Sequence, residues 1–171
     1  MHFVDPDYYH KLLSPSLVGP GFAADVFDGG ERDNVAFMAP IGGYTGQLWR
    51  FLPTGDGAFL LTTLFRGPVL RACVTDGGPN DGEIRLAPGD SPAQQWIVEP
   101  LHGPESFAVM SSDAPVPFVR AGYVRLSTRL RGPTWSLDLA VGGEAFMPTL
   151  AERSDAPGQA WLLARTGARV G

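Results

Sequence analysis

The sequence predicts an all-β domain made of three copies of one four-stranded unit. Three observations support this prediction: one triplet occurs three times, two further landmarks repeat in step with it, and helix-breaking residues are frequent. Glycine occurs 22 times and proline 16 times in 171 residues, and the longest stretch free of both is only ten residues, 105–114. Long helices are therefore excluded, because proline breaks a helix and glycine weakens it.

The internal repeat is carried by three landmarks in a constant order. Successive copies are 48 and then 65 residues apart for the first two landmarks, and 47 and then 65 apart for the third. A repeat kept in step at three places indicates three copies of one structural unit. The landmarks are Gly-Pro at 19, 67 and 132, Gly-Gly at 29, 77 and 142, and Gln-x-Trp at 47, 94 and 159.

Within each copy the spacing of apolar residues is that of β-strands. In residues 125–131 arginine and serine alternate with Leu126, Thr128 and Leu130, so one face of this strand is polar and the other faces the core. Each copy is too small to bury a core alone, and we expect the three to close around a pseudo-threefold axis. The other expected strands are 22–27, 70–75 and 135–140, then 35–39, 83–87 and 147–151, and one opening at each Gln-x-Trp.

A chain of this length fits a single domain. The repeats are expected at about 8–53, 54–101 and 123–165, which together make one domain over 1–171. The third copy follows the second after about 18 extra residues. We interpret residues 104–122, which contain three prolines, as an inserted loop or hairpin between repeats 2 and 3, because most connections in compact domains are much shorter.

Composition and charge exclude several classes of protein. Hydrophobic residues make up 44% of the chain, which is enough for a core, and the formal net charge is −5. An acidic protein is a poor partner for nucleic acid, because phosphate binding needs a basic surface. No apolar run is long enough for membrane insertion. The N-terminus lacks the features of a signal peptide, so a cytoplasmic location is the default expectation, with export by another route left open.

The repeated residues resemble those of a known family. Gln-x-Trp in each of three repeats is the hallmark of the β-trefoil lectins of the ricin B-chain type, and the resemblance is best over residues 62–96 and 126–161. It implies a β-trefoil fold and a carbohydrate or glycoconjugate as the partner. It also implies that the three indoles lie in the core and that the three glutamine amides satisfy backbone groups at a turn. The indoles are those of Trp49, Trp96 and Trp161.

The same resemblance suggests where a sugar would bind. The acid that binds sugar hydroxyls in this family corresponds to Asp25 in the first copy and Asp138 in the third, whereas Cys73 stands there in the second. A stacking aromatic should come from the third strand of a copy, and Phe37 is the residue nearest to that place. We therefore predict a first site of Asp25, Asn34 and Phe37, and a second at Asp138 with nearby Phe146. The alternative is that both aspartates only cap turns.

Catalysis finds little support in the sequence. His2, His10 and His102 have no partnered serine or cysteine and do not form a metal-binding pair. Asp76 to Glu83 is rich in oxygen ligands, but a polar hairpin turn explains it without calcium. We expect no cofactor and no metal, and a binding module rather than an enzyme.

A second interpretation has a different class of partner. A trefoil with vestigial sugar pockets would act as a protein-interaction or assembly scaffold. Its contacts would come from the 104–122 insertion, with its aromatic residues, or from a local stripe of arginines in an otherwise acidic chain. The candidate residues are Phe107, Phe118, Arg125, Arg129 and Arg131.

Overall fold

The structure is a computed structural model that describes residues 4–15, 21–101, 118–139 and 147–171. Within these residues the chain forms twelve strands and three one-turn 3-10 helices. Four strands and one 3-10 turn, in the same order, make up each repeat. Repeat 1 contains β1 (Tyr8–Leu13), β2 (Phe22–Val26), β3 (Ala36–Pro40), η1 (Thr45–Gln47) and β4 (Trp49–Pro53). Repeat 2 contains β5 (Phe59–Thr63), β6 (Leu70–Val74), β7 (Ile84–Pro88), η2 (Pro92–Gln94) and β8 (Trp96–Pro100). Repeat 3 contains β9 (Phe118–Thr128), β10 (Trp135–Asp138), β11 (Thr149–Glu152), η3 (Pro157–Gln159) and β12 (Trp161–Arg169).

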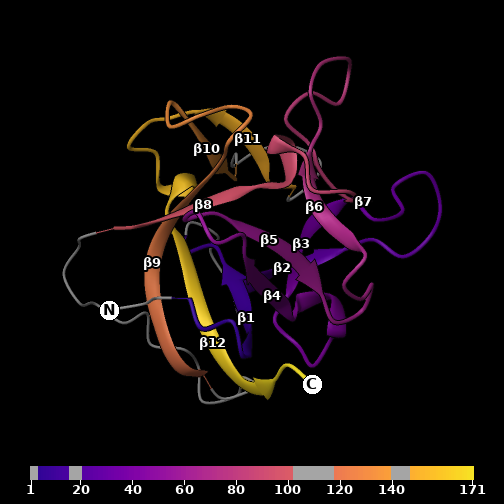
Figure 1. The fold of residues 1–171 in the computed structure, drawn as a ribbon, viewed down its shortest axis with the longest axis vertical. Helices are drawn as coiled ribbons and strands as arrows, with labels where there is room; N and C mark the ends of the chain where they lie inside the picture. The colour runs from indigo at the N-terminus through magenta and orange to yellow at the C-terminus, as the bar shows by residue number, and fades with distance from the viewer. Residues whose placement is uncertain (1–3, 16–20, 102–117, 140–146) are drawn as a thin grey trace.

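The first and fourth strands of the repeats form a closed barrel. Its strands follow the order β1-β4-β5-β8-β9-β12, and β12 returns to pair with β1. The second and third strands of each repeat pair as the hairpins β2–β3, β6–β7 and β10–β11. Figure 1 shows β1, β9 and β12 side by side in the lower left of the molecule, with the β10–β11 hairpin at the top and the β6–β7 hairpin at the upper right. Because the barrel closes on itself, none of its six strands is left as an edge.

The pairing register shows that the three repeats are equivalent. The tryptophan that opens each fourth strand lies opposite one residue of a first strand: His10 faces Trp49, Phe59 faces Trp96 and Val124 faces Trp161. Each indole N–H also donates a hydrogen bond of 2.9 Å to a backbone carbonyl of the second strand in its own repeat. The acceptors are the carbonyls of Ala24, Ala72 and Leu137.

One hydrophobic core is shared by all three repeats. The three indoles expose at most 2% of their surface and belong to the same cluster as Phe51, Leu126 and Leu139. The prediction that these tryptophans are core residues is therefore confirmed. The buried tryptophan donors are all paired, as buried polar groups must be if burial is to stabilise the fold.

In the third repeat the strand boundaries expected from the sequence differ from those in the structure. Strand β9 begins at Phe118, so residues 118–122, expected in the insertion, belong to the barrel. The reason is that β12 runs on to Arg169 and offers a partner over this extra length, with Thr166 opposite Phe118. The rest of the expected insertion, up to residue 117, lies outside the described residues. Leu130, expected on the core face, follows the end of the strand at Thr128 and is 41% exposed.

Candidate functional site

The glutamines of the three Gln-x-Trp triplets hold the turn that precedes each fourth strand. Every one of them donates from Nε2 to the carbonyl seven residues earlier and accepts at Oε1 from a backbone N–H of the same loop, at 2.8–3.1 Å. The predicted role of the glutamine amides at a turn is confirmed. The three residues are Gln47, Gln94 and Gln159, and each is buried.

Asp25 lies next to the first of these glutamines. Its Oδ2 accepts a hydrogen bond of 3.3 Å from Nε2 of Gln47, and its Oδ1 accepts one of 2.8 Å from the backbone N–H of Val26. The residue is 9% exposed. Burial raises the pKa of its carboxyl group, while the bonds from Val26 and Gln47 and the charge of Lys11 act to lower it.

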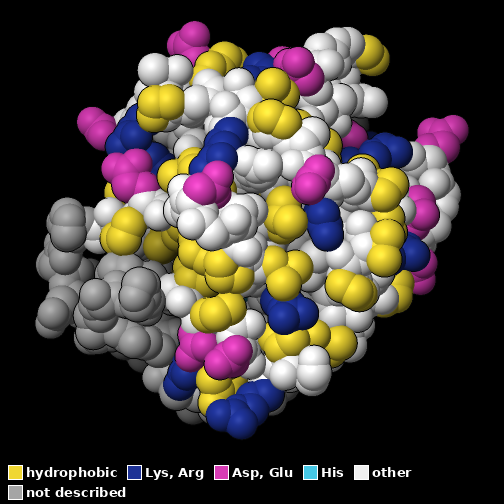
Figure 2. Space-filling model, in the orientation of Figure 1, with side chains coloured by type: hydrophobic (Ala, Val, Ile, Leu, Met, Phe, Trp, Pro, Cys, Tyr) yellow, Lys and Arg dark blue, Asp and Glu magenta, His cyan; other side chains and the backbone are white. Residues whose placement is uncertain are grey.

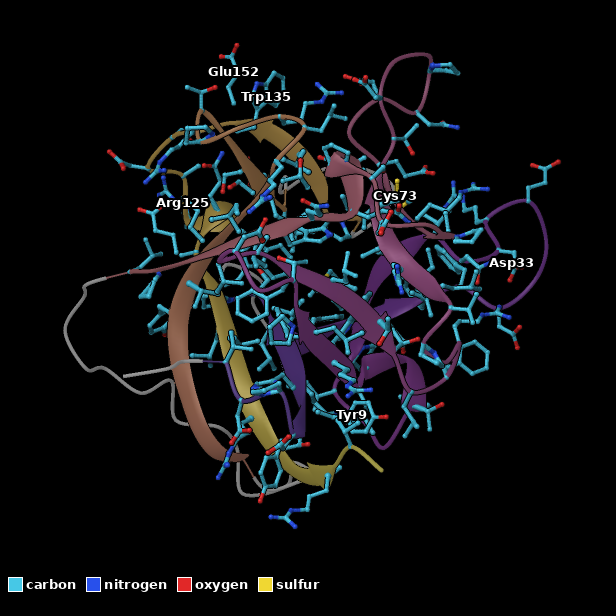
Figure 3. All side chains as sticks on the ribbon, in the orientation of Figure 1. Tyr9, Asp33, Cys73, Arg125, Trp135 and Glu152 are labelled. Atoms are coloured by element: carbon cyan, nitrogen blue, oxygen red, sulfur yellow. The ribbon has the colours of Figure 1, made fainter. Side chains whose placement is uncertain are left out.

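Asp138 occupies the same place in repeat 3 and is half-buried. Its Oδ2 accepts a hydrogen bond of 3.2 Å from Nε2 of Gln159. Cys73 stands on β6 at the corresponding place of repeat 2, as Figure 3 shows. Its thiol donates a weak hydrogen bond of 3.6 Å to the carbonyl of Val74, and burial raises the pKa of the thiol. Repeats 1 and 3 therefore keep a carboxylate bound to the glutamine, and repeat 2 has lost it.

Phe37 and Asn34 complete the first predicted site. Phe37 lies on β3 directly opposite Asp25, and its ring stacks on Phe27 with 4.0 Å between centroids and 14° between planes. Asn34, between β2 and β3, adopts a φ of 67°, in the left-handed region that asparagine tolerates better than most residues. Its Nδ2 donates to Asp33, whereas its Oδ1 is buried and has no partner in the part of the chain that the structure describes. The structure thus brings Asp25 and Phe37 together, with Asn34 at the end of the same hairpin.

The second predicted site is incomplete within the described residues. Asp138 lies opposite Thr149 on β11, which offers no aromatic ring. Phe146, the aromatic suggested for this site, lies outside the described residues.

Lys11 is a polar residue of the site that the sequence interpretation missed. It is fully buried. Its Nζ donates a hydrogen bond of 3.0 Å to Oε1 of Gln47 and a second hydrogen bond to the carbonyl of Gly42. Burial lowers its pKa, and the charge of Asp25 acts in the opposite direction. Two features of the sequence could have drawn attention to it: it is the only lysine of the chain, and two leucines follow it directly.

Two of the predicted partner-binding arginines are engaged within the molecule. Arg131 forms ion pairs with Asp76, at 3.0 Å, and with Asp81, and its guanidinium lies 4.9 Å from the ring centroid of Trp135. Arg129 pairs with Asp56 at 2.6 Å. These contacts tie repeat 3 to the loops of repeat 2, so both arginines contribute to packing between repeats.

An equivalent ion-pair cluster joins repeat 2 to repeat 1. Arg66 forms ion pairs with Asp28 at 3.1 Å and with Asp33 at 2.6 Å. The two aspartates lie in the loop between β2 and β3, and Figure 3 shows Asp33 at the outer edge of the molecule. Of the other predicted contacts, Arg125 lies in β9 opposite Glu99, Phe118 begins that strand, and Phe107 lies outside the described residues. On the face drawn in Figure 2, basic side chains are separated by acidic, apolar and uncharged ones.

The described residues contain neither a metal-binding cluster nor a membrane-spanning helix. No cluster of three or more histidine, cysteine, aspartate or glutamate side chains in this part of the chain has the arrangement needed to hold a metal ion. No helix in the same residues has the length and apolar character required to cross a membrane.

No protein-family model and no curated protein sequence matches the chain. Solved structures do match it over nearly its whole length. The designed threefold symmetric protein ThreeFoil has a TM-score of 0.66 at 22% identity, with 91% of this chain and 97% of ThreeFoil covered. The ricin B-like lectin of Macrolepiota procera, solved in complex with lactose, has a TM-score of 0.64 at 20% identity, with 95% and 98% covered.

The fold is a β-trefoil. A mosquitocidal holotoxin contains a similar trefoil, with a TM-score of 0.70 at 15% identity. The match covers 96% of this chain but only 18% of the holotoxin, so this trefoil is similar to one part of a much longer protein. At these identities the likeness extends to the trefoil fold alone.

Proposed function

We propose that this β-trefoil is a non-catalytic carbohydrate-binding module whose main site lies in repeat 1. The observation that carries the proposal is the placing of Asp25 opposite Phe37 on one hairpin, with the carboxylate held by Gln47. Sugar recognition needs an acceptor for hydroxyl groups beside an aromatic face against which the C–H surface of the ring can stack. Asn34 adds an amide at the end of the same hairpin; its Oδ1 is buried and has no hydrogen-bond partner among the described residues.

The three repeats are not equally suited to this function. In repeat 2 the carboxylate is replaced by Cys73, and Arg85 lies opposite it where repeat 1 has Phe37. Repeat 3 keeps Asp138 bound to its glutamine, and we propose it as a second site. The ricin B-like lectin of similar fold binds lactose, which supports a saccharide as the class of ligand.

The proposal is tested by a glycan array, followed by calorimetric titration of the sugars it selects. We expect micromolar to millimolar dissociation constants. Asp25→Asn keeps the shape of the side chain but removes its charge, and should weaken binding by about 1–3 kcal/mol. Phe37→Leu should weaken binding through the loss of stacking. Cys73→Ser in repeat 2 is the matched control and should leave binding unchanged. The absence of binding to every saccharide, or equal binding by Asp25→Asn, would contradict the proposal.

A specific surface favours the second candidate function, a protein-interaction scaffold. Among the described residues, four of the five exposed large apolar side chains gather around the link between β5 and β6, where the backbone N–H of Phe65 bonds to the carbonyl of Thr45. They are Tyr44 at 62%, Leu64 at 43%, Phe65 at 38% and Val69 at 66%. If no saccharide binds, a partner whose retention is lost in Phe65→Ser or Val69→Ser, but not in Phe37→Leu, would support the scaffold instead.

A further inference from the structure

Lys11 is the only lysine in the chain, and none of its surface is exposed. It shares its face of β1 with Leu13, which belongs to a small apolar cluster with Leu162 and Ala164. A lysine is almost never fully buried unless its ammonium group is paired. The partners of Lys11 are therefore expected to have a definite role.

Those partners lead to the proposed sugar site. The ammonium group donates to the carbonyl of Gly42 and to Oε1 of Gln47, and Nε2 of Gln47 donates to Oδ2 of Asp25. The amide of Gln47 is held in one orientation, because Oε1 accepts from Lys11 and from the N–H of Gly42 while Nε2 donates to Pro40 and Asp25. If the amide were flipped, its NH₂ group would face the donors of Lys11 and Gly42, and its oxygen would face the oxygens of Pro40 and Asp25.

The other two repeats lack this arrangement. Oε1 of Gln94 accepts from the N–H and the hydroxyl of Ser91, and Oε1 of Gln159 accepts from the N–H of Ser154. No lysine is available to either. Asp138, which is bonded to Gln159 as Asp25 is to Gln47, is therefore an internal reference for a carboxylate without a buried ammonium group behind it.

We propose that Lys11 is a positioning residue for the site in repeat 1: acting through Gln47, its ammonium group holds the buried Asp25 carboxylate in place and favours its charged form, ready to accept hydrogen bonds from saccharide hydroxyls. The part that concerns a saccharide rests on the proposed function. The coupling of Lys11 to Asp25 does not rest on it and can be measured in the protein alone.

Lys11 is well placed for this role, because it is the charged group that acts on Asp25. Strand β3 presents the uncharged Phe37 to Asp25, and η1, which packs on β2, contains no charged residue. Burial raises the pKa of Asp25 and Lys11 lowers it, while Asp25 in turn raises the pKa of Lys11 against the effect of burial. Each group thus favours the charged form of the other, as linkage between two sites requires.

The first test is a ¹³C NMR titration of the side-chain carboxyl carbons of Asp25 and Asp138. In Lys11→Met the titration midpoint of Asp25 should rise, because an opposite charge has been removed. Lys11→Arg should restore most of the original midpoint. The midpoint of Asp138 should stay unchanged in both variants. An unchanged Asp25, or an equal shift of both aspartates, would overturn the proposal.

A reciprocal test measures the coupling of Lys11 to Asp25 from the lysine side, and it can be used if Lys11→Met does not fold. Because the chain has one lysine, its ¹³Cε signal needs no assignment among others. In Asp25→Asn the titration midpoint of Lys11 should fall, and in Asp138→Asn it should not. A midpoint that is the same in the wild type and Asp25→Asn would overturn the coupling.

Sugar titration separates this inference from the proposed function. Measured at pH 8 and at pH 5, the affinity of Lys11→Met should fall more than that of the wild type as the pH is lowered, because its Asp25 takes up a proton at a higher pH. If a saccharide binds and Lys11→Met binds it equally at both pH values, the positioning role is wrong and the function stands. If no saccharide binds to any variant, the proposed function fails, and the NMR titrations still decide whether Lys11 controls Asp25.

Discussion

The carboxylate of Asp25 lies against the backbone of Gly46, so closely that a β-carbon at Gly46 would overlap Oδ1. Asp138 and Gly158 have the same relationship in repeat 3. In repeat 2, where Cys73 replaces the aspartate, Ala93 replaces the glycine. The residue before each Gln-x-Trp glutamine is therefore small enough for the side chain beneath it, and the two positions vary together among the three repeats.

The pair can be tested by exchange between repeats. Gly46→Ala should destabilise the fold by about 1–3 kcal/mol, because the new methyl group has no room above Asp25. The double variant Asp25→Cys with Gly46→Ala, which copies repeat 2, should recover most of that loss. Ala93→Gly is the control and should cost about 1 kcal/mol or less. Urea unfolding measures all four proteins. A single Gly46→Ala variant as stable as the wild type would refute the packing argument.

The three indoles should be close to equivalent in their contribution to stability. Trp49→Phe removes the donor to the carbonyl of Ala24 and leaves a space in the core, so we expect a loss of at least about 2 kcal/mol. Trp96→Phe and Trp161→Phe should cost similar amounts in thermal or urea unfolding. Trp135→Phe, at a half-buried position, should cost less than half as much. A large inequality among the first three would contradict the threefold equivalence.

Stability should fall as the pH is lowered through the titration range of His10. This histidine is fully buried, and burial lowers its pKa from 6.5 to about 4. Between these values the unfolded chain binds a proton that the folded chain excludes, so the free energy of unfolding is highest above pH 6.5 and decreases toward pH 4. The full decrease from this residue amounts to roughly 3 kcal/mol.

His10→Phe provides the matched comparison, because Phe59 occupies the corresponding barrel position in repeat 2. The variant should lose this part of the pH dependence, as measured by urea unfolding at pH 7.5, 6, 5 and 4.5. The raised pKa of Asp25 favours the folded state at low pH and acts in both proteins, so it cancels in the difference. Parallel curves for the two proteins would show that His10 does not titrate differently on unfolding.

The ion pairs between repeats should make a modest contribution that depends on salt. Arg131→Met removes two ion pairs and the contact with Trp135, and we expect a loss of about 1–2 kcal/mol at low ionic strength. Arg129→Met, which loses the single partner Asp56, should cost less. In 1 M NaCl the difference in the free energy of unfolding between Arg131→Met and the wild type should become smaller, because salt screens the exposed aspartates. A difference that grows with salt would contradict an electrostatic cause.

Much of the architecture could be predicted from local patterns. The expected strand 70–75 is β6 at Leu70–Val74, and the tryptophans lie in the core as expected. Alternation of apolar residues and glycine turns are local properties, so they can be read without knowing the fold. The start of β9 at Phe118 could not be read in this way, because its strand partner Thr166 lies far along the chain.

The candidate site was predictable only in part. Asp25 and Phe37 are cross-strand neighbours in one short hairpin, so their pairing could be predicted from the local sequence. The hydrogen bonds of Gln47 with Lys11 and Asp25 join residues 36 and 22 positions apart, and these could not. The sequence pattern indicates only a local stripe of arginines as a candidate partner contact. Its pairing with aspartates of the preceding repeat depends on how the repeats pack.

By itself the sequence determined that the chain is three copies of one β-unit around a common core, because a repeated apolar pattern can bury its surface only by association of the copies. The tertiary structure decided which polar groups meet. Closure of the barrel by β1 and β12 and the folding of the 41–46 loop over Lys11 bring distant side chains into a water-poor environment. In that environment an unpaired buried charge is destabilising, so each charge needs a partner. Which partner is available depends on the tertiary structure and cannot be predicted from a local sequence pattern.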